Sequence, residues 1–176
     1  IEAHPLKDRI YARVTADRAR TEAAAAAARA GAGLRLSSLD GVPISWKDLF
    51  DTAGCATEAG TALLKDRIPE ADAEVVRNAT AAGLVCLGKT HLSELAFSGL
   101  GVNPITTPPP CVNDAEAAPG GSSSGAAASV AFGLAAAAIG SDTGGAVRVP
   151  SAWNDLVGPK ITAGRLSNAG VVPLAA

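Results

Sequence analysis

Residues 119–140, PGGSSSGAAASVAFGLAAAAIG, give the clearest indication of the fold. It opens on proline, glycine and serine. The alanine-rich tract that follows, from Ala126 to Ile139, is interrupted by Ser129 and Gly133 and predicts a buried helix followed by a strand. The tract is shorter than the roughly 18 apolar residues that a membrane-spanning helix needs. We therefore predict a globular domain with no membrane partner.

The same order of helix and strand occurs earlier in the chain. Residues 71–82 predict a helix, with two acidic residues in the first turn, where they favour the helix dipole. Residues 84–88, LVCLG, then predict a buried strand. Residues 41–47, GVPISWK, predict another strand, with Pro43 at its start or on an edge of the sheet. Alternating helices and strands favour an α/β fold, with a mixed β-sheet covered by helices.

Two further regions complete the expected outline. Residues 6–30 consist of strong helix formers and predict one long helix that ends at Gly31 to Gly33. Residues 103–119 are rich in proline and polar residues, with three prolines at 108–110, and predict a long loop. Loops of this length often lie beside a functional site.

Composition limits the classes of function. The 15 basic and 17 acidic residues give a net charge of −2, so we expect no direct contact with nucleic acid. The 176 residues contain no interdomain linker and suit part of a single domain without an internal boundary. Because the chain starts at Ile1 and ends on the apolar, strand-like VVPLAA, we expect a fragment that is incomplete at its C-terminus.

Cysteines and histidines indicate neither disulfides nor a metal site. Cys55, Cys86 and Cys111 form no CxxC pair and no even set, which favours buried free thiols in a reducing cytoplasm. His4 and His91 have no second ligand at metal spacing. We therefore expect a cytoplasmic protein with no metal, and we also expect no organic cofactor.

One motif is misleading. Residues 83–90, GLVCLGKT, fit the phosphate-binding pattern GxxxxGK[ST]. That motif requires a flexible loop after a strand, whereas the middle residues here are strand-like and a helix precedes them. We interpret the segment as a strand followed by a turn.

Two glycine–serine segments are candidates for chemistry. Three serines in residues 120–125 could cap the following helix, or the glycines could allow a ligand to approach the backbone. Residues 140–150, GSDTGGAVRVP, could form a nest of amides for a negatively charged oxygen, or a tight turn held by Asp142. Acyl transfer needs such a nest, because its tetrahedral intermediate carries an oxyanion.

Together with Lys47, these segments resemble the amidase signature family. The resemblance extends from DGVPISWKD at 40–48 through GKT at 88–90, GGSSSG and DTGG, to RVPSA at 148–152 and the stretch 164–173. It implies a hydrolase of amide bonds with a serine–serine–lysine triad. It also implies a GKT strand end and a catalytic domain more than twice as long as this chain.

The resemblance assigns roles by position. It implies that Lys47 is the general base, and that Ser122 is the bridging serine, preceded by a cis peptide bond. The nucleophile position is Ala146, and Thr143, Gly144, Gly145 and residue 146 supply the oxyanion hole. Ser123 is implied to be a hydrogen-bonding partner behind these groups. A lysine can serve as a base near neutral pH only when burial lowers its pKa.

Alanine at position 146 departs from the family, which has the attacking serine there. Ser141 and Ser151 are each five residues away, and nothing in the sequence indicates that either replaces it. Two interpretations stay open: a serine-to-alanine substitution made to trap a substrate, or a naturally inactive relative. We predict an amidase that cleaves a carboxamide C–N bond, with negligible activity as written.

The alternatives are a non-catalytic binding relative and the A subunit of a glutamyl-tRNA amidotransferase. We expect a small-molecule amide substrate and leave a homo-oligomer open.

Overall fold

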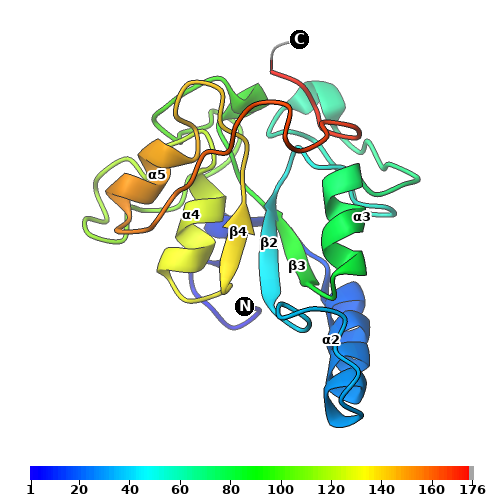
Figure 1. Ribbon diagram of the computed structural model, residues 1–176. Helices are drawn as coiled ribbons and strands as arrows, with labels where there is room; N and C mark the ends of the chain where they lie inside the picture. Colours follow the sequence, from blue (N-terminus) through cyan, green and yellow to red (C-terminus); the bar gives the residue numbers. More distant parts are fainter. Residues whose placement is uncertain (175–176) are drawn as a thin grey trace.

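The computed structural model describes residues 1–174 and shows a four-stranded sheet in the order β1–β3–β2–β4 (Figure 1). The strands are β1 (Tyr11–Val14), β2 (Pro43–Lys47), β3 (Val85–Thr90) and β4 (Ala137–Ile139). Strand β2 pairs in parallel with both β3 and β4, and β1 pairs antiparallel with β3. The predicted mixed sheet is confirmed.

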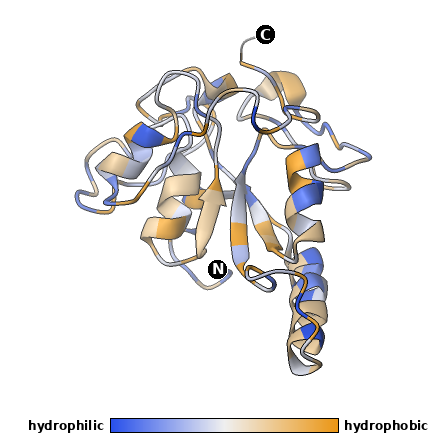
Figure 2. Cartoon of the chain, in the orientation of Figure 1, coloured by the Kyte–Doolittle hydropathy of each residue, from blue (hydrophilic) through white to orange (hydrophobic). Residues whose placement is uncertain are grey.

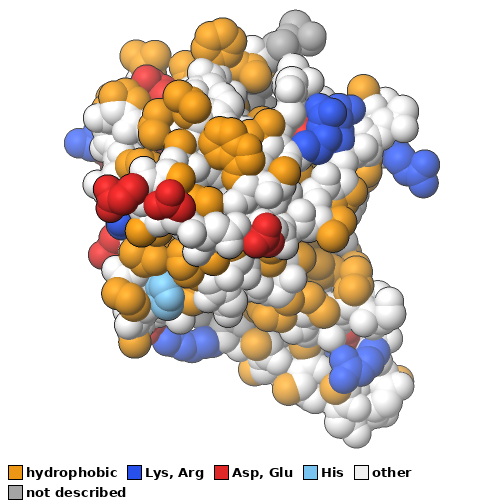
Figure 3. Space-filling model, turned by 90° about the vertical axis from the view of Figure 1, so that its left-hand side faces the viewer, with side chains coloured by type: hydrophobic (Ala, Val, Ile, Leu, Met, Phe, Trp, Pro, Cys, Tyr) orange, Lys and Arg blue, Asp and Glu red, His pale blue; other side chains and the backbone are white. Residues whose placement is uncertain are grey.

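Helices cover both sides of this sheet, with α4 and α5 on one side and α3 on the other (Figure 1). The helices are α1 (Lys7–Ile10), α2 (Ala16–Gly31), α3 (Glu74–Ala81), α4 (Ser124–Ala131) and α5 (Arg148–Trp153), with two short 3₁₀ helices, η1 (Ala62–Leu64) and η2 (Glu94–Ala96). Helix α4 is buried over its first six residues, 124–129, and is coloured mainly hydrophobic in Figure 2. On the side that carries α4 and α5, charged and hydrophobic side chains are mixed, and the basic ones do not gather into a patch (Figure 3).

The prediction of one helix over residues 6–30 is wrong, because β1 interrupts it. Tyr11 and Val14 have side chains that favour strands, and the segment gains hydrogen bonds by pairing with β3. Burial reinforces this choice, since Tyr11 is 3% exposed and its hydroxyl lies 2.7 Å from Ser45 Oγ. Local helix propensity is therefore overridden by tertiary pairing. The predicted end of the helix at Gly31 is confirmed.

Strand β2 separates two environments by the two-residue alternation of a strand. Ile44 and Trp46 enter the main hydrophobic core, where Val76 of α3 is also buried. Ser45 and Lys47 point to the opposite face, toward α4 and the loops beside it. Pro43 begins the strand as predicted, but β2 lies inside the sheet and not at its edge.

The remaining expectations have mixed outcomes. Residues 84–88 are confirmed as strand, and because β3 extends to Thr90, the GKT segment is strand and not a phosphate loop. The helix and strand predicted after Ala126 are confirmed, as is the long loop at 103–119. At the C-terminus, Val171 forms an isolated bridge with Phe50 instead of a strand, and residues 175–176 lie outside the described residues.

The three cysteines are free thiols, with Cys86 and Cys111 buried and Cys55 half-buried. Within residues 1–174, no helix is long and apolar enough to cross a membrane. No cluster of three or more potential metal-binding side chains occurs in that same range.

Candidate active site

The centre of the site is the amine of Lys47, at the carboxyl end of β2. Its side chain is fully buried. Lys47 Nζ lies 2.6 Å from Ser122 Oγ and 2.8 Å from Ser141 Oγ. Ser122 precedes α4 and Ser141 follows β4, so two segments that lie 75 and 94 residues after Lys47 converge on its amine.

The serine segment before α4 serves this site and does not cap the helix. Ser123 occupies the N-cap position, but its side chain makes no capping hydrogen bond. Its hydroxyl instead donates to the carbonyl oxygen of Ser141, at 3.4 Å. The Gly121–Ser122 peptide bond is cis, as the family resemblance implies.

A close backbone approach explains one glycine of this segment. Gly120 has φ +79°, and a Cβ added there would lie 2.8 Å from the Cα atom of Pro150. A side chain is therefore excluded by both conformation and space. The consequence is that the serine segment lies directly against the start of α5.

Position 146 lies beside the two serines. The amide of Ser123 donates to the carbonyl oxygen of Ala146 at 3.1 Å. Ala146 is half-buried and offers only a methyl group there. The structure thus brings Lys47, Ser122, Ser123 and the backbone of residue 146 together, whereas the catalytic roles assigned to them stay predictions.

Asp142 organises the loop that contains position 146. Its carboxylate accepts hydrogen bonds from the amides of Gly145 (2.7 Å) and Val147 (3.1 Å) and from the Arg148 backbone (3.2 Å). It also accepts two hydrogen bonds from the Arg148 guanidinium, at 3.0 and 2.9 Å. The Arg148 guanidinium is the main reason that the pKa of Asp142 is well below its usual range. The interpretation of Asp142 as a structural group in a tight turn is therefore supported.

The amides expected to form an oxyanion hole differ in availability. The amide of Gly145 is engaged by Asp142 and is not free to bind a ligand in this conformation. Within residues 1–174, the amides of Thr143, Gly144 and Ala146 have no hydrogen-bond acceptor, and Thr143 and Gly144 are exposed. Within this loop, these three amides are therefore the ones whose N–H groups are unengaged among the described residues.

The environment of Lys47 favours the neutral amine. Burial removes the charged form from water and lowers the pKa of Lys47 from 10.5 to about 7, although the negative charge of Asp142 opposes this shift. The groups in hydrogen-bonding contact with its amine are neutral hydroxyls. An amine with this pKa can accept a proton near neutral pH.

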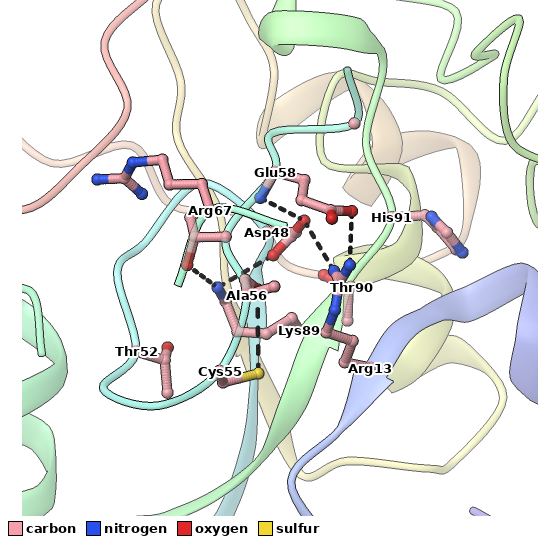
Figure 4. A network of polar contacts seen from close by, with 12 residues as sticks. Arg13, Asp48, Thr52, Cys55, Ala56, Glu58, Arg67, Lys89, Thr90 and His91 are labelled. Carbon is pink, nitrogen blue, oxygen red and sulfur yellow. Dashed lines mark hydrogen bonds and ion pairs between the residues drawn. The ribbon is translucent and has the colours of Figure 1, made fainter. Parts of the chain in front are cut away.

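A second buried lysine lies on the opposite face of the sheet. Lys89 of β3 forms an ion pair with Asp48 at 3.0 Å and donates a hydrogen bond to Thr57 at 2.8 Å (Figure 4). Arg13 links the carboxylates of Asp48 and Glu58 in the same network. Unlike Lys47, Lys89 is therefore matched by a carboxylate.

The contact of Ser141 with Lys47 is not predicted by the sequence motifs, in which Ser141 is a candidate only for a replacement nucleophile. Strands β2 and β4 are parallel neighbours, so their carboxyl ends lie at the same edge of the sheet. Ser141 follows β4 just as Lys47 ends β2. This correspondence between two strand ends is the signal that could have placed the two side chains together.

The chain belongs to the Amidase family, whose sequence profile matches residues 2–176.

Similar proteins carry related names. The chain is 48% identical to the A subunit of the glutamyl-tRNA(Gln) amidotransferase of Anaeromyxobacter sp. (strain K) over 164 residues, which cover 92% of this chain and 33% of that protein. It superposes on native peptide amidase from Stenotrophomonas maltophilia with a TM-score of 0.90 and 35% identity, covering 99% of this chain and 36% of that one. The glutamyl-tRNA(Gln) amidotransferase A subunit from Thermotoga maritima has a TM-score of 0.75 and 39% identity, with 78% of this chain and 30% of that one covered. The chain thus spans about a third of the length of these relatives.

Proposed function

We propose that the protein is an amidase-type hydrolase of the serine–serine–lysine kind, in which Lys47 is the base and Ser122 the proton relay. Position 146 is the nucleophile position and carries alanine here. The observation that supports this proposal most strongly is the buried Lys47 amine, 2.6 Å from Ser122 Oγ. Its pKa of about 7 provides a neutral base at physiological pH.

With a serine at position 146, the chemistry follows from this geometry. The attacking hydroxyl passes its proton to Ser122 Oγ, while Ser122 gives its own proton to the lone pair of Lys47. The new oxygen–carbon bond forms at the amide carbonyl, and the amides of Thr143, Gly144 and residue 146 stabilise the oxyanion. The C–N bond then breaks, the departing nitrogen takes the proton from the relay, and water hydrolyses the ester to the acid.

Ala146 has no hydroxyl and cannot form this ester. We propose that the protein as written can bind an amide but does not turn it over. Losing a catalytic serine removes several orders of magnitude of rate, and only the contributions of the oxyanion site and of binding are left.

The named relatives favour a second candidate function, as one subunit of a larger enzyme. Identity of 48% to the A subunit of an amidotransferase supports a role as one component of an enzyme that works with partner subunits. In that case the small-molecule amide would be the ammonia donor, and contact with nucleic acid would fall to other subunits. Association with itself is the alternative form of assembly.

The test is the Ala146→Ser variant, treated with a fluorophosphonate that labels activated serines. We expect labelling at position 146 to be faster than any labelling of the unchanged protein by roughly three orders of magnitude or more. This covalent step needs only the local triad, and ammonia release from simple carboxamides measures turnover in parallel.

The matched control is the Lys47→Ala change in the Ala146→Ser background, which should abolish the gain. A folded Ala146→Ser protein that is labelled no faster than the unchanged one would contradict the proposed function. Equal labelling with and without Lys47 would contradict its role as the base.

A further inference from the structure

Ser141 supplies the second hydroxyl at the Lys47 amine, and neither the proton relay nor the oxyanion site uses it. Its Oγ lies 2.8 Å from Lys47 Nζ. Within the described residues 1–174, Lys47 is the only hydrogen-bonding partner of that hydroxyl. Its presence in the site therefore needs a reason within the chemistry of Lys47.

The reason lies in the shape of a neutral amine. A neutral lysine amine has two N–H donors and one lone pair, and it can take a proton from Ser122 only when the lone pair points toward it. A single hydroxyl partner leaves the amine free to turn a donor toward Ser122. A second hydroxyl that accepts an N–H removes this freedom, which the flexible four-carbon lysine side chain would otherwise keep.

Ser141 is itself held in place. Its carbonyl oxygen accepts a hydrogen bond from Ser123 Oγ at 3.4 Å. A Cβ added to Gly140 would lie 2.5 Å from the same Ser123 oxygen, so only glycine allows this segment to pack against the serine pair. Of the two hydroxyls at Lys47, one belongs to Ser122, and the other belongs to Ser141, whose backbone is held by the neighbouring Ser123.

We propose that Ser141 is a positioning residue that accepts a hydrogen bond from Lys47 and turns its lone pair toward Ser122. This inference rests on the proposed role of Lys47 as the base.

Few charged groups lie around this amine. Asp142 follows Ser141 and is paired with Arg148. Tyr11 of β1 reaches the same face of the sheet through Ser45, whereas Asp48 and Lys89 pair on the other face. Helix α4 and strand β4 carry no charged residue. A change in the titration of Lys47 after removal of the Ser141 hydroxyl can therefore be assigned to that hydroxyl if Asp142 keeps its contacts.

The first experiment measures the titration of Lys47 in the chain as it exists, from the nitrogen-15 shift of its amine. A hydroxyl acceptor favours the charged amine, so we expect Lys47 to titrate at lower pH in Ser141→Ala than in the unchanged protein. Ser141→Thr keeps the hydroxyl and should restore the original titration. Ser151→Ala is the matched control, because Ser151 is also five residues from position 146 but does not contact Lys47.

The second experiment measures fluorophosphonate labelling in the Ala146→Ser background, at a pH where Lys47 is neutral in every variant. We expect Ser141→Ala to lower this limiting rate by about 10- to 100-fold through misplacement of the base, and Ser141→Thr to restore it. If Ser141 had only a structural role, its substitutions would not change the limiting labelling rate and the titration of Lys47 together.

The inference is overturned if Ser141→Ala and Ser151→Ala give the same Lys47 titration, or if Ser141→Thr behaves like Ser141→Ala. If Ser141→Ala does not fold, Ser141→Cys replaces it, because a thiol fills the same space but is a weak acceptor. If the Ala146→Ser protein is not labelled at all, the proposed function fails while the titration still decides the role of Ser141.

Discussion

Lys47 and Lys89 lie on adjacent strands, and both side chains are fully buried, yet the protein treats them in opposite ways. Lys89 faces Asp48 at 3.0 Å within a network that includes Arg13 and Glu58 (Figure 4). Lys47 faces the hydroxyls of Ser122 and Ser141. Burial lowers its pKa to about 7, and within residues 1–174 no carboxylate forms an ion pair with it to offset that burial.

The difference shows that burial alone does not prepare a lysine to act as a base. Removing a charge from water is costly, and the cost is offset only when an opposite charge and hydrogen bonds accompany it. On the face that carries Lys89, Asp48 supplies the opposite charge, and the buried ion pair is part of the structure. On the face that carries Lys47, the partners are hydroxyls without charge, which favours the neutral amine.

The largest effect is expected from the Lys47→Met variant. The folded pKa of about 7 lies below the ordinary 10.5, so the cost of burying the charge is fully present below pH 7 and disappears as the pH rises to 10.5. The free energy of unfolding of the unchanged protein should therefore gain about 5 kcal/mol over this range relative to Lys47→Met. Denaturant unfolding of both proteins at several pH values measures the difference. If the free energies of unfolding of the two proteins changed in parallel with pH, Lys47 would not be a lysine whose buried charge destabilises the fold.

The next effect concerns the compensated lysine. Asp48→Asn leaves Lys89 buried without its counter-charge and should lower the free energy of unfolding by about 3–5 kcal/mol. Denaturant unfolding at pH 7 measures it. Asp17→Asn is the matched control, because Asp17 is fully exposed and its loss should leave stability nearly unchanged. Equal effects of the two substitutions would show that the Lys89 network is not structural.

The sequence predicts the role of Lys47 but not that of Lys89. Lys47, Ser122 and position 146 follow from short motifs whose order and spacing match a known family. The role of Lys89 in a buried ion pair was not predicted, because its partner Asp48 follows another strand and the pairing depends on register. The contact of Ser141 with Lys47 was missed for the same kind of reason, since it depends on two parallel strands ending together.

The fold shows the same limit. The strands at 43–47 and 85–90 and helix α4 follow from local patterns of glycine, proline and apolar residues. Strand β1 does not, because Tyr11 to Val14 lie within a helix-forming sequence and become a strand only by pairing with β3. Long-range pairing is the information that a local pattern lacks.

The smallest effect is expected at the loop that adjoins Lys47. Arg148→Gln removes the main group that lowers the pKa of Asp142, but Arg148 is half exposed, so its loss should destabilise the protein at pH 7 far less than Asp48→Asn does. Because the folded pKa of Asp142 is depressed, this loss should be complete above the ordinary value of 3.8 and should shrink as the pH falls below it. Thermal unfolding of both proteins well above and well below that value measures the change. A loss that is equal under both conditions would assign the effect to packing of the arginine side chain.

The proposed chemistry depends most directly on the protonation of one amine. Nitrogen-15 spectra of the lysine amines, recorded from acidic to strongly basic pH with Lys47→Met for assignment, report it without any assay of activity. We predict that Lys47 is half-protonated near pH 7. Half-protonation near the ordinary value of 10.5 would contradict the assignment of Lys47 as the base.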